Sequence, residues 1–289
     1  MEMVLDILLD ATIDTAKLVP FLFVTYLAME AIERAASGKT TAAIQRAGYA
    51  GPLIGALLGA FPQCGFSAAA ATFYAGRVVT LGTLIAVFLA TSDEMIPIMI
   101  AEQADPALVL KILGIKVAVG MVMGFIVDAL ARLARHGAPS KERIHELCEA
   151  DHCHCEEGEG ILGSALRHTI QVTVFIFVVS LALTALVEGV GEDVLAGFLT
   201  SNPELSIVAS AVVGLIPNCA ASVVITELYL EGSLGLGACI AGLLVSAGIG
   251  LLVLLRTNRR PRENIGIIVL LLAIGIAWGL LINVTGLSL

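Results

Sequence analysis

The stretch Pro62-Gln63-Cys64-Gly65 recurs as Pro217-Asn218-Cys219-Ala220, from position 62 to position 217, an offset of 155 residues. Each copy interrupts a stretch that is otherwise strongly apolar. A register held without gaps over this distance indicates duplication, so the chain contains two copies of one unit. The same offset aligns Gly59 with Gly214, Ser67 with Ser222, Tyr74 with Tyr229, Gly82 with Gly237, Gly120 with Gly275 and Gly124 with Gly279.

The composition is that of a polytopic membrane protein. Hydrophobic residues make up 58% of the 289 residues, charged residues make up 14%, and the mean hydropathy is +0.95, far above that of an ordinary soluble domain. Asp6, Asp10 and Asp14 replace the basic region of a cleavable signal peptide, so we expect none. Apolar runs of about 20 residues, the length of a membrane-spanning helix, lie near 15–33, 80–100, 111–131, 164–187, 234–255 and 264–285.

Basic residues gather in three polar loops, after the first, fifth and ninth predicted spans. By the positive-inside rule these loops face the cytoplasm. We therefore expect a protein of the plasma membrane with both termini outside and the link between its halves inside. The loops contain Arg34, Lys39 and Arg46, then Arg132, Arg135, Lys141 and Arg143, then Arg256, Arg259, Arg260 and Arg262.

The predicted fold is an all-α membrane protein with about ten segments in two inverted-topology repeats. We expect the first repeat over 1–135, a linker over 136–160 and the second repeat over 161–289. Each half contains an odd number of segments, so the second copy enters the membrane upside down relative to the first. The segments beside the tetrads are about half a span long. They fit short tilted helices or re-entrant hairpins, and the plain alternative is a proline kink in a packed helix.

The two tetrads are the first candidate binding site. Proline lacks an amide hydrogen and disfavours helix before it, so nearby carbonyls lose their helical partners. The helices that restart after each proline point positive N-terminal ends into the same space. Inverted hairpins would bring Cys64 and Cys219 together near the bilayer centre, where thiolates suit soft ions and thiophilic metalloids. The candidate substrate contacts are Pro62, Gln63, Cys64, Ser67, Pro217, Asn218, Cys219 and Ser222.

Two adjacent carboxylates, Asp93 and Glu94, form the second candidate site, between apolar stretches of the fourth span. The repeat register aligns Thr91 with Ser246 and Asp93 with Gly248, in the middle of the ninth span. The acids are therefore expected inside the membrane, at a cost on the order of 3 kcal/mol on insertion scales unless they are protonated, paired or hydrated, which makes them candidates for a functional role. The alternative is that the fourth span ends before them and they lie in an outer loop.

Other residues in the spans give weaker signals. Lys116 and Asp128 flank the ends of the fifth span closely enough to extend toward the membrane interface. Cys239, alone in the ninth span, is interpreted as a small packing residue.

The linker between the halves is rich in cysteine, histidine and acidic residues. Such tracts bind metals such as zinc or copper, although this spacing matches no standard zinc finger. The alternative is a solvated acidic tether. The candidate ligands of this accessory cytoplasmic metal site are His145, Cys148, His152, Cys153, His154 and Cys155.

The tetrads, the run Thr91-Ser92-Asp93-Glu94 and the linker together resemble the ten-span heavy-metal exporters, a family also labelled arsenic efflux proteins or manganese transporters. The resemblance covers nearly the whole chain and implies a gradient-driven, alternating-access permease that exports a metal ion or metalloid. Cys64 and Cys219 would contact the cargo, Gln63 and Asn218 would orient it, and Asp93 or Glu94 would ligate it or carry a coupling proton. Manganese would favour the carboxylates and trivalent arsenic the thiols.

Two other function classes stay open: an anion permease that uses paired helix N-termini, and a membrane thiol redox enzyme. The chain has no nucleotide-binding loop, so transport is expected to follow a gradient. We expect a transporter and not an enzyme, with no cofactor. The expected partners are the metal or metalloid, the lipid bilayer, protons as a coupling ion and a second copy of the chain in a homo-oligomer, but no nucleic acid.

Overall fold

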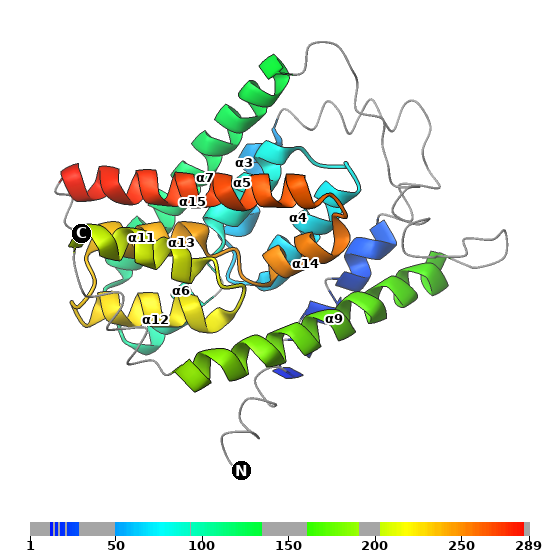
Figure 1. Cartoon of the computed structure of the whole chain (residues 1–289), viewed down its shortest axis with the longest axis horizontal. Helices are drawn as coiled ribbons and strands as arrows, with labels where there is room; N and C mark the ends of the chain where they lie inside the picture. The colour runs from blue at the N-terminus through cyan, green and yellow to red at the C-terminus, as the bar shows by residue number, and fades with distance from the viewer. Residues whose placement is uncertain are drawn as a thin grey trace.

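The computed structural model describes residues 12–13, 15–16, 18–20, 22–28, 50–92, 94–134, 161–190 and 203–285. All regular secondary structure in these ranges is α-helical, as the apolar runs predict (Figure 1). After the helical residues between 12 and 28, the helices are α3 (Gly51–Gly59), α4 (Cys64–Ala75), α5 (Leu81–Ala90), α6 (Met95–Ala101), α7 (Pro106–Ala134), α9 (Ile161–Val190), α11 (Pro203–Gly214), α12 (Cys219–Leu230), α13 (Leu236–Val245), α14 (Ile249–Thr257) and α15 (Pro261–Thr285).

The helices of the two halves correspond in length and in packing. α12 and α13 begin and end 155 residues after α4 and α5, and α15 begins 155 residues after α7. The packing partners correspond as well, because α5 packs against α3 and α7 while α13 packs against α11 and α15. The duplication in sequence is therefore also a duplication of helical structure. The inverted orientation of the two units in the membrane stays a prediction.

Glycines explain how closely these helices approach one another. A Cβ atom added to Gly82 of α5 would lie 2.1 Å from the carbonyl oxygen of Gly124 in α7. A Cβ atom added to Gly237 of α13 would lie 2.6 Å from the carbonyl oxygen of Gly279 in α15. Both distances are too short for a side chain, so these register-matched pairs are contacts between helix backbones, as small residues permit in membrane proteins.

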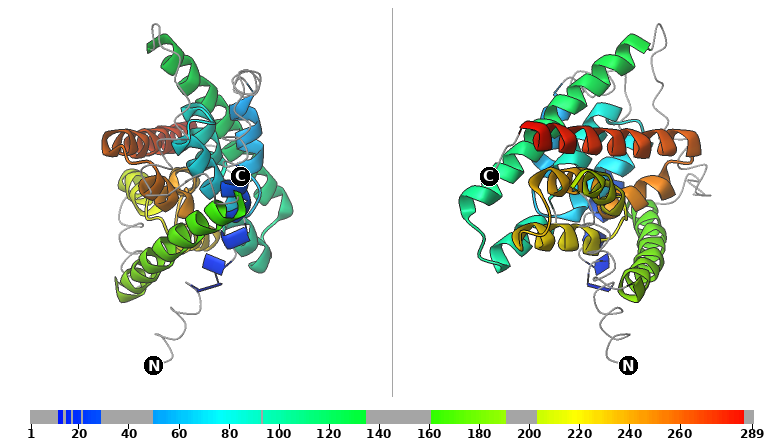
Figure 2. Two further views of the ribbon diagram at one scale, coloured as in Figure 1. Left: turned by 90° about the vertical axis from the view of Figure 1, so that its right-hand side faces the viewer. Right: turned by 60° about the vertical axis from the view of Figure 1, so that its left-hand side comes forward.

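α5 and α13 form the centre of the molecule. They contact each other, and every residue of α5 from Gly82 to Ala90 and of α13 from Gly237 to Val245 is buried. In Figures 1 and 2, α15 lies alongside α13 and α9 runs along one side of the molecule. α7 and α15 keep large apolar side chains exposed, such as Leu130, Leu133 and Val269, which suits a surface that faces lipid.

Four described segments are long and apolar enough to cross a membrane: Leu81–Ala101, Pro106–Leu133, Leu236–Thr257 and Pro261–Thr285. Shorter apolar helices include Ala165–Val179, Leu205–Gly214 and Ala220–Leu230. The prediction of a multi-pass membrane protein is confirmed at this level. The first and third segments are each made of two helices, so the fourth and ninth predicted spans are interrupted, and these interruptions form the site described next.

Candidate functional site

Two register-matched helices end in the interior of the protein. α5 ends at Ala90 and α6 begins at Met95, while α13 ends at Val245 and α14 begins at Ile249. Two residues in the first break are buried: Thr91 is 4% exposed and Ser92 is 2% exposed. α5 ends at Ala90, and the position of Asp93 and Glu94 within the membrane stays a prediction. The chain leaves the helix after Ala90, and Thr91 and Ser92 remain buried.

The second break depends on a glycine. Gly248, the residue before α14, has φ 54° and ψ −144°, a backbone conformation that only glycine adopts readily. Ser246 in the same break is buried. The two breaks thus place hydroxyl side chains and backbone carbonyl groups without helical partners in the centre of the protein.

Lys116 of α7 joins the two halves at these breaks. Its side chain is 1% exposed, and its ammonium group donates hydrogen bonds to the carbonyl oxygen of Thr91 and, at 2.8 Å, to that of Leu243. Sequence reasoning placed Lys116 near the membrane interface, and this is wrong. An ionisable residue within a membrane helix was the available signal, since such residues usually face the interior and mark function.

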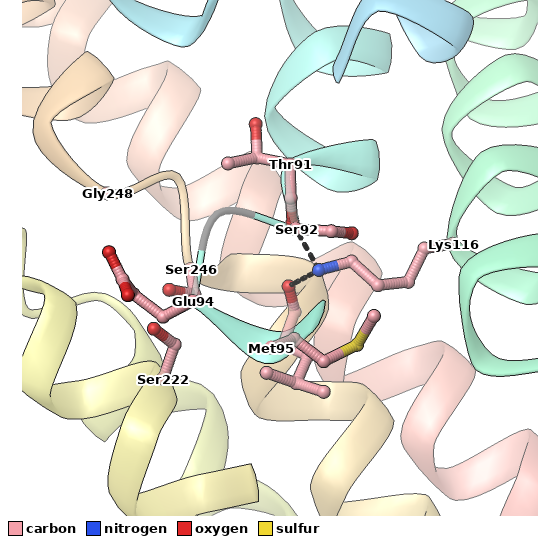
Figure 3. Close-up of a pocket in the computed structure, with 9 residues that line it drawn as sticks. Thr91, Ser92, Glu94, Met95, Lys116, Ser222, Ser246 and Gly248 are labelled. Carbon is pink, nitrogen blue, oxygen red and sulfur yellow. Dashed lines mark hydrogen bonds between the residues drawn. The ribbon is translucent and has the colours of Figure 1, made fainter. Parts of the chain in front are cut away.

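A small pocket lies between the breaks (Figure 3). Its volume is about 10 Å³, room for about one water molecule. In Figure 3, Lys116 reaches into the pocket from the α7 side, and Glu94 and Ser222 lie on the other side. The lining residues are Thr91, Ser92, Glu94, Met95, Lys116, Ser222, Leu243, Ser246 and Gly248.

The pocket brings together two residues that the sequence predicted as substrate contacts and two residues that the 155-residue offset aligns. Glu94 and Ser222 were predicted substrate contacts, and both line it. Thr91 and Ser246 were aligned by the register and lie in the two breaks. These four come from both halves of the chain, so the pocket is built by the two repeats together.

The polar atoms of the pocket favour a small ion with oxygen ligands. The lining offers four hydroxyl groups, the Glu94 carboxylate and the thioether of Met95. No group of three or more His, Cys, Asp or Glu residues converges within the described ranges. A cation held here would therefore depend on hydroxyl and carbonyl oxygens in addition to a carboxylate, which are the ligands of hard divalent cations.

Helix ends give the site its electrostatic character. The C-terminal ends of α5 and α13 carry partial negative charge, and the N-terminal ends of α6 and α14 carry partial positive charge. The Lys116 ammonium lies at the negative ends, where it accounts for two of their carbonyl groups. These two hydrogen bonds contribute to holding the Lys116 ammonium in the protein interior.

The two tetrads form the turns between short helices. α3 ends at Gly59 and α4 begins at Cys64, and α11 ends at Gly214 and α12 begins at Cys219. The side-chain oxygen of Asn218 accepts a hydrogen bond from the backbone amide of Ala220, so Asn218 caps α12. The lining of the small pocket does not include Pro62, Gln63, Cys64, Pro217 or Asn218.

The helices that follow the tetrads do reach the breaks. α4 packs against α14, and α12 packs against α6. A Cβ atom added to Gly250 in the first turn of α14 would lie 2.6 Å from the Cβ atom of Ser67. Ser67 and Ser222 thus lie near the second and first break respectively. The Cys219 side chain lies outside the described part of the chain, so the proximity of Cys64 and Cys219 stays a prediction.

Some predicted ligands fall on residues that the structure does not describe. Asp93 lies outside the described residues, as do the linker residues His145, Cys148, His152, Cys153, His154 and Cys155. Their roles as metal ligands stay predictions.

Asp128 has a structural role. Its carboxylate accepts hydrogen bonds from the Thr80 hydroxyl at 2.7 Å and from the Gly82 backbone amide at 2.8 Å. Thr80 in turn caps α5 by accepting from the Thr83 amide. Asp128 therefore stabilises the N-terminal end of α5, where a negative charge is favourable. Its carboxylate is buried against α5 and does not extend freely from the end of α7.

A large apolar crevice of about 780 Å³ lies elsewhere, between the N-terminal helical residues and α3, α4 and α5. Among the residues that the structure describes, its lining includes Val24, Leu58, Phe66 and Phe73 and no ionisable side chain. The described part of this lining is mainly apolar, whereas the small pocket combines a carboxylate with hydroxyl groups, so we take the small pocket as the candidate site.

A polar cluster connects the halves away from the pocket. The Arg77 guanidinium donates to both carboxylate oxygens of Glu263, and the Tyr74 hydroxyl donates to one of them at 3.0 Å. These hydrogen bonds raise the pKa of the Arg77 guanidinium. Arg77 has φ 61°, as Gly232 at the matching position has φ 76°. We call Tyr74, Arg77 and Glu263 the inter-repeat clamp.

The clamp should contribute measurably to stability. In a double-mutant cycle with Arg77→Gln and Glu263→Gln, we expect a coupling energy of about 1–3 kcal/mol, because bidentate hydrogen bonds to charged groups are stronger than neutral ones. Glutamine at position 77 keeps a non-glycine residue at positive φ, so the backbone strain cancels. The measurement is thermal or denaturant unfolding of the purified protein in detergent. A coupling energy near zero would show that the clamp is only a surface contact.

The comparisons with known proteins agree with the helical architecture. A family model described as "Putative, 10TM heavy-metal exporter" matches residues 1–161 and again residues 156–287. The two matches together cover nearly the whole chain. No curated protein and no solved structure matches the chain.

Proposed function

Because the chain belongs to the family of ten-transmembrane heavy-metal exporters, we propose that it moves a metal cation out of the cytoplasm through the pocket between its two helix breaks. The observation that carries this proposal is the pair of register-matched helices, α5 and α13, that both end at one polar pocket in the protein interior. Irregular backbone at membrane depth is tolerated where it lines a cavity, and paired broken helices hold the substrate in many transporters.

The oxygen-rich lining supports a hard or borderline divalent cation such as Mn²⁺ over a thiophilic metalloid. Glu94 supplies the negative charge, and hydroxyl groups such as those of Ser222 and Ser246 supply further ligands. Cys64 lies outside the lining. In this proposal the tetrads are the turns that position α4 and α12 beside the breaks, with Asn218 capping α12, and Asp93 adds a second carboxylate.

Alternating access requires the two repeats to move relative to each other around the pocket. The inter-repeat clamp supports closure at one end, because it ties the turn after α4 to the start of α15. The 155-residue offset aligns Arg77 with Gly232 and Glu263 with Leu108. Gly232 and Leu108 cannot form an ion pair, so the clamp has no counterpart at these positions. The Arg-rich stretch at 256–262, which contains the turn between α14 and α15, lies beside Glu263, so we propose that the clamp closes the cytoplasmic end.

An anion permease is the second candidate. The Lys116 ammonium and the N-terminal end of α14 lie at the same pocket and would attract an anion. The Glu94 carboxylate opposes this use.

Transport by the purified protein in proteoliposomes tests the proposal. We expect saturable transport of Mn²⁺ or Zn²⁺, little transport of arsenite, and none of chloride. Cys64→Ser should keep most of the Mn²⁺ transport, whereas Ser246→Ala should lower it by roughly tenfold. Ser233→Ala, an exposed serine in the turn after α12, is the matched control and should have no effect. Arsenite transport that collapses in Cys64→Ser, without Mn²⁺ transport, would move the site to the tetrads, and chloride transport would favour the anion permease.

A further inference from the structure

The Lys116 ammonium is itself a cation bound at the two breaks. Its ammonium group contacts the carbonyl oxygens of Thr91 and Leu243, which lie at the C-terminal ends of α5 and α13. One oxygen belongs to each repeat. A carbonyl oxygen at a helix C-terminus has no helical donor and carries the negative end of the helix dipole, so it is a ligand for a cation.

We propose that Lys116 is a tethered cation that occupies the cargo site in the absence of metal and competes with the metal for the same carbonyl oxygens. This inference rests on the proposed function, because it concerns the affinity of the same pocket for its cargo. It makes Lys116 a residue that sets cargo affinity and allows release.

The size of the pocket supports competition. With Lys116 in place, the remaining volume is about 10 Å³, so the ammonium and a metal with its ligands cannot share the position. Like charges at this separation repel strongly in a site shielded from water. A metal that enters must therefore displace the ammonium from Thr91 and Leu243.

The asymmetry of the repeats supports a specific role. The position that matches Lys116 in the second half is Leu271, which is fully buried. One ammonium therefore serves the ends of both helices. If the lysine only joined helices within one repeat, we would expect a lysine at this position in both repeats. If it competes with a single cargo at the centre of the protein, one lysine in one repeat is enough.

Competition also gives a physical reason for release. Two helix C-termini together with Glu94 would hold a divalent cation tightly in a buried pocket. The return of the Lys116 ammonium to the carbonyl oxygens stabilises the site without cargo, and thereby lowers the free-energy difference between the loaded and empty protein. A transporter must bind cargo weakly enough to let it leave.

Equilibrium binding of Mn²⁺ to the purified full chain tests the inference. Lys116→Met keeps the length of the side chain and removes its charge, and we expect it to bind Mn²⁺ at least about tenfold more tightly than the wild type, with slower turnover in proteoliposomes. Lys116→Gln keeps a donor for the carbonyl oxygens and should also bind more tightly if the methionine variant fails to fold. Lys111→Met, at an exposed position of the same helix, should bind Mn²⁺ as the wild type does.

The outcomes separate the inference from the proposed function. If Lys116 only joins the helices, its variants will lose stability and bind Mn²⁺ equally or more weakly, while the wild type still transports Mn²⁺, and the inference alone is overturned. If neither the wild type nor any Lys116 variant binds or transports Mn²⁺ or Zn²⁺, the proposed function fails and the inference fails with it. Binding that appears only in the Lys116 variants supports the inference.

Discussion

Replacing Glu94 with Gln is expected to lower metal export by at least about 100-fold, because the change removes the carboxylate from the pocket between the two breaks. Membrane insertion should be retained, since neutralising an acid inside the membrane relieves a cost on the order of 3 kcal/mol. The measurement is the rate of Mn²⁺ transport in proteoliposomes, divided by the amount of folded protein. We expect the same result for Asp93→Asn, which is a prediction from sequence alone.

Glu102→Gln provides a matched control for Glu94→Gln. Glu102 lies directly after α6, as Glu94 lies directly before it, but its side chain is exposed and outside the pocket lining. We expect wild-type transport from this variant. Wild-type transport from Glu94→Gln would show that the carboxylate is not a ligand, and equal losses from both variants would point to a general effect of charge on α6.

The sequence predicts the repeated architecture well because the signal is long and gapless. The 155-residue register predicts which helices correspond, and the structure shows the same offset between α4 and α12 and between α5 and α13. The glycine pairs of the register, such as Gly82 with Gly237, occupy matching close contacts between helices. A residue retained at a packing contact leaves a clear mark in sequence because no other residue fits there.

The breaks in the fourth and ninth spans are much harder to predict. Hydropathy averages over about 20 residues, so a few polar residues within an apolar run do not reveal where a helix stops. The first break contains Thr91 and Ser92, which a membrane helix can also accommodate through hydrogen bonds to its own carbonyls. The second break depends on the positive φ of Gly248, and a glycine in a membrane helix more often marks close packing.

The residues that are most conspicuous in the sequence, those of the tetrads, are mostly not the residues that line the pocket. The thiol of Cys64 is the more conspicuous chemical group, yet the pocket is lined by hydroxyl groups, a carboxylate and Lys116. Serine and threonine are common in membrane segments, so their presence in the sequence says little about whether a given hydroxyl group faces a ligand. The partners of Lys116 are backbone carbonyls on two other helices, and no residue pattern specifies them.

Gly248→Ala is expected to disrupt the second break and the transport that depends on it. Alanine at φ 54° and ψ −144° carries a backbone strain on the order of 1–3 kcal/mol. We expect the chain to relieve this strain by moving the backbone at position 248 toward another conformation. That movement shifts Ser246 and the start of α14, which contribute to the pocket. We expect transport per folded protein to fall by at least about tenfold, together with a lower unfolding midpoint in detergent.

Two matched substitutions separate backbone strain from damage to the site. Gly232→Ala introduces strain at φ 76° in the turn after α12, where an added Cβ meets no atom within 4 Å, so it should lower stability but leave transport per folded protein unchanged. Gly266→Ala lies in α15, also in open space, and should raise stability slightly through helix propensity. Gly248→Ala differs from both because it alters the pocket geometry. If Gly248→Ala transports as well per folded protein as Gly232→Ala does, the conformation of the second break is not needed for function. The proposal of a cargo site in the pocket between the two breaks is then wrong.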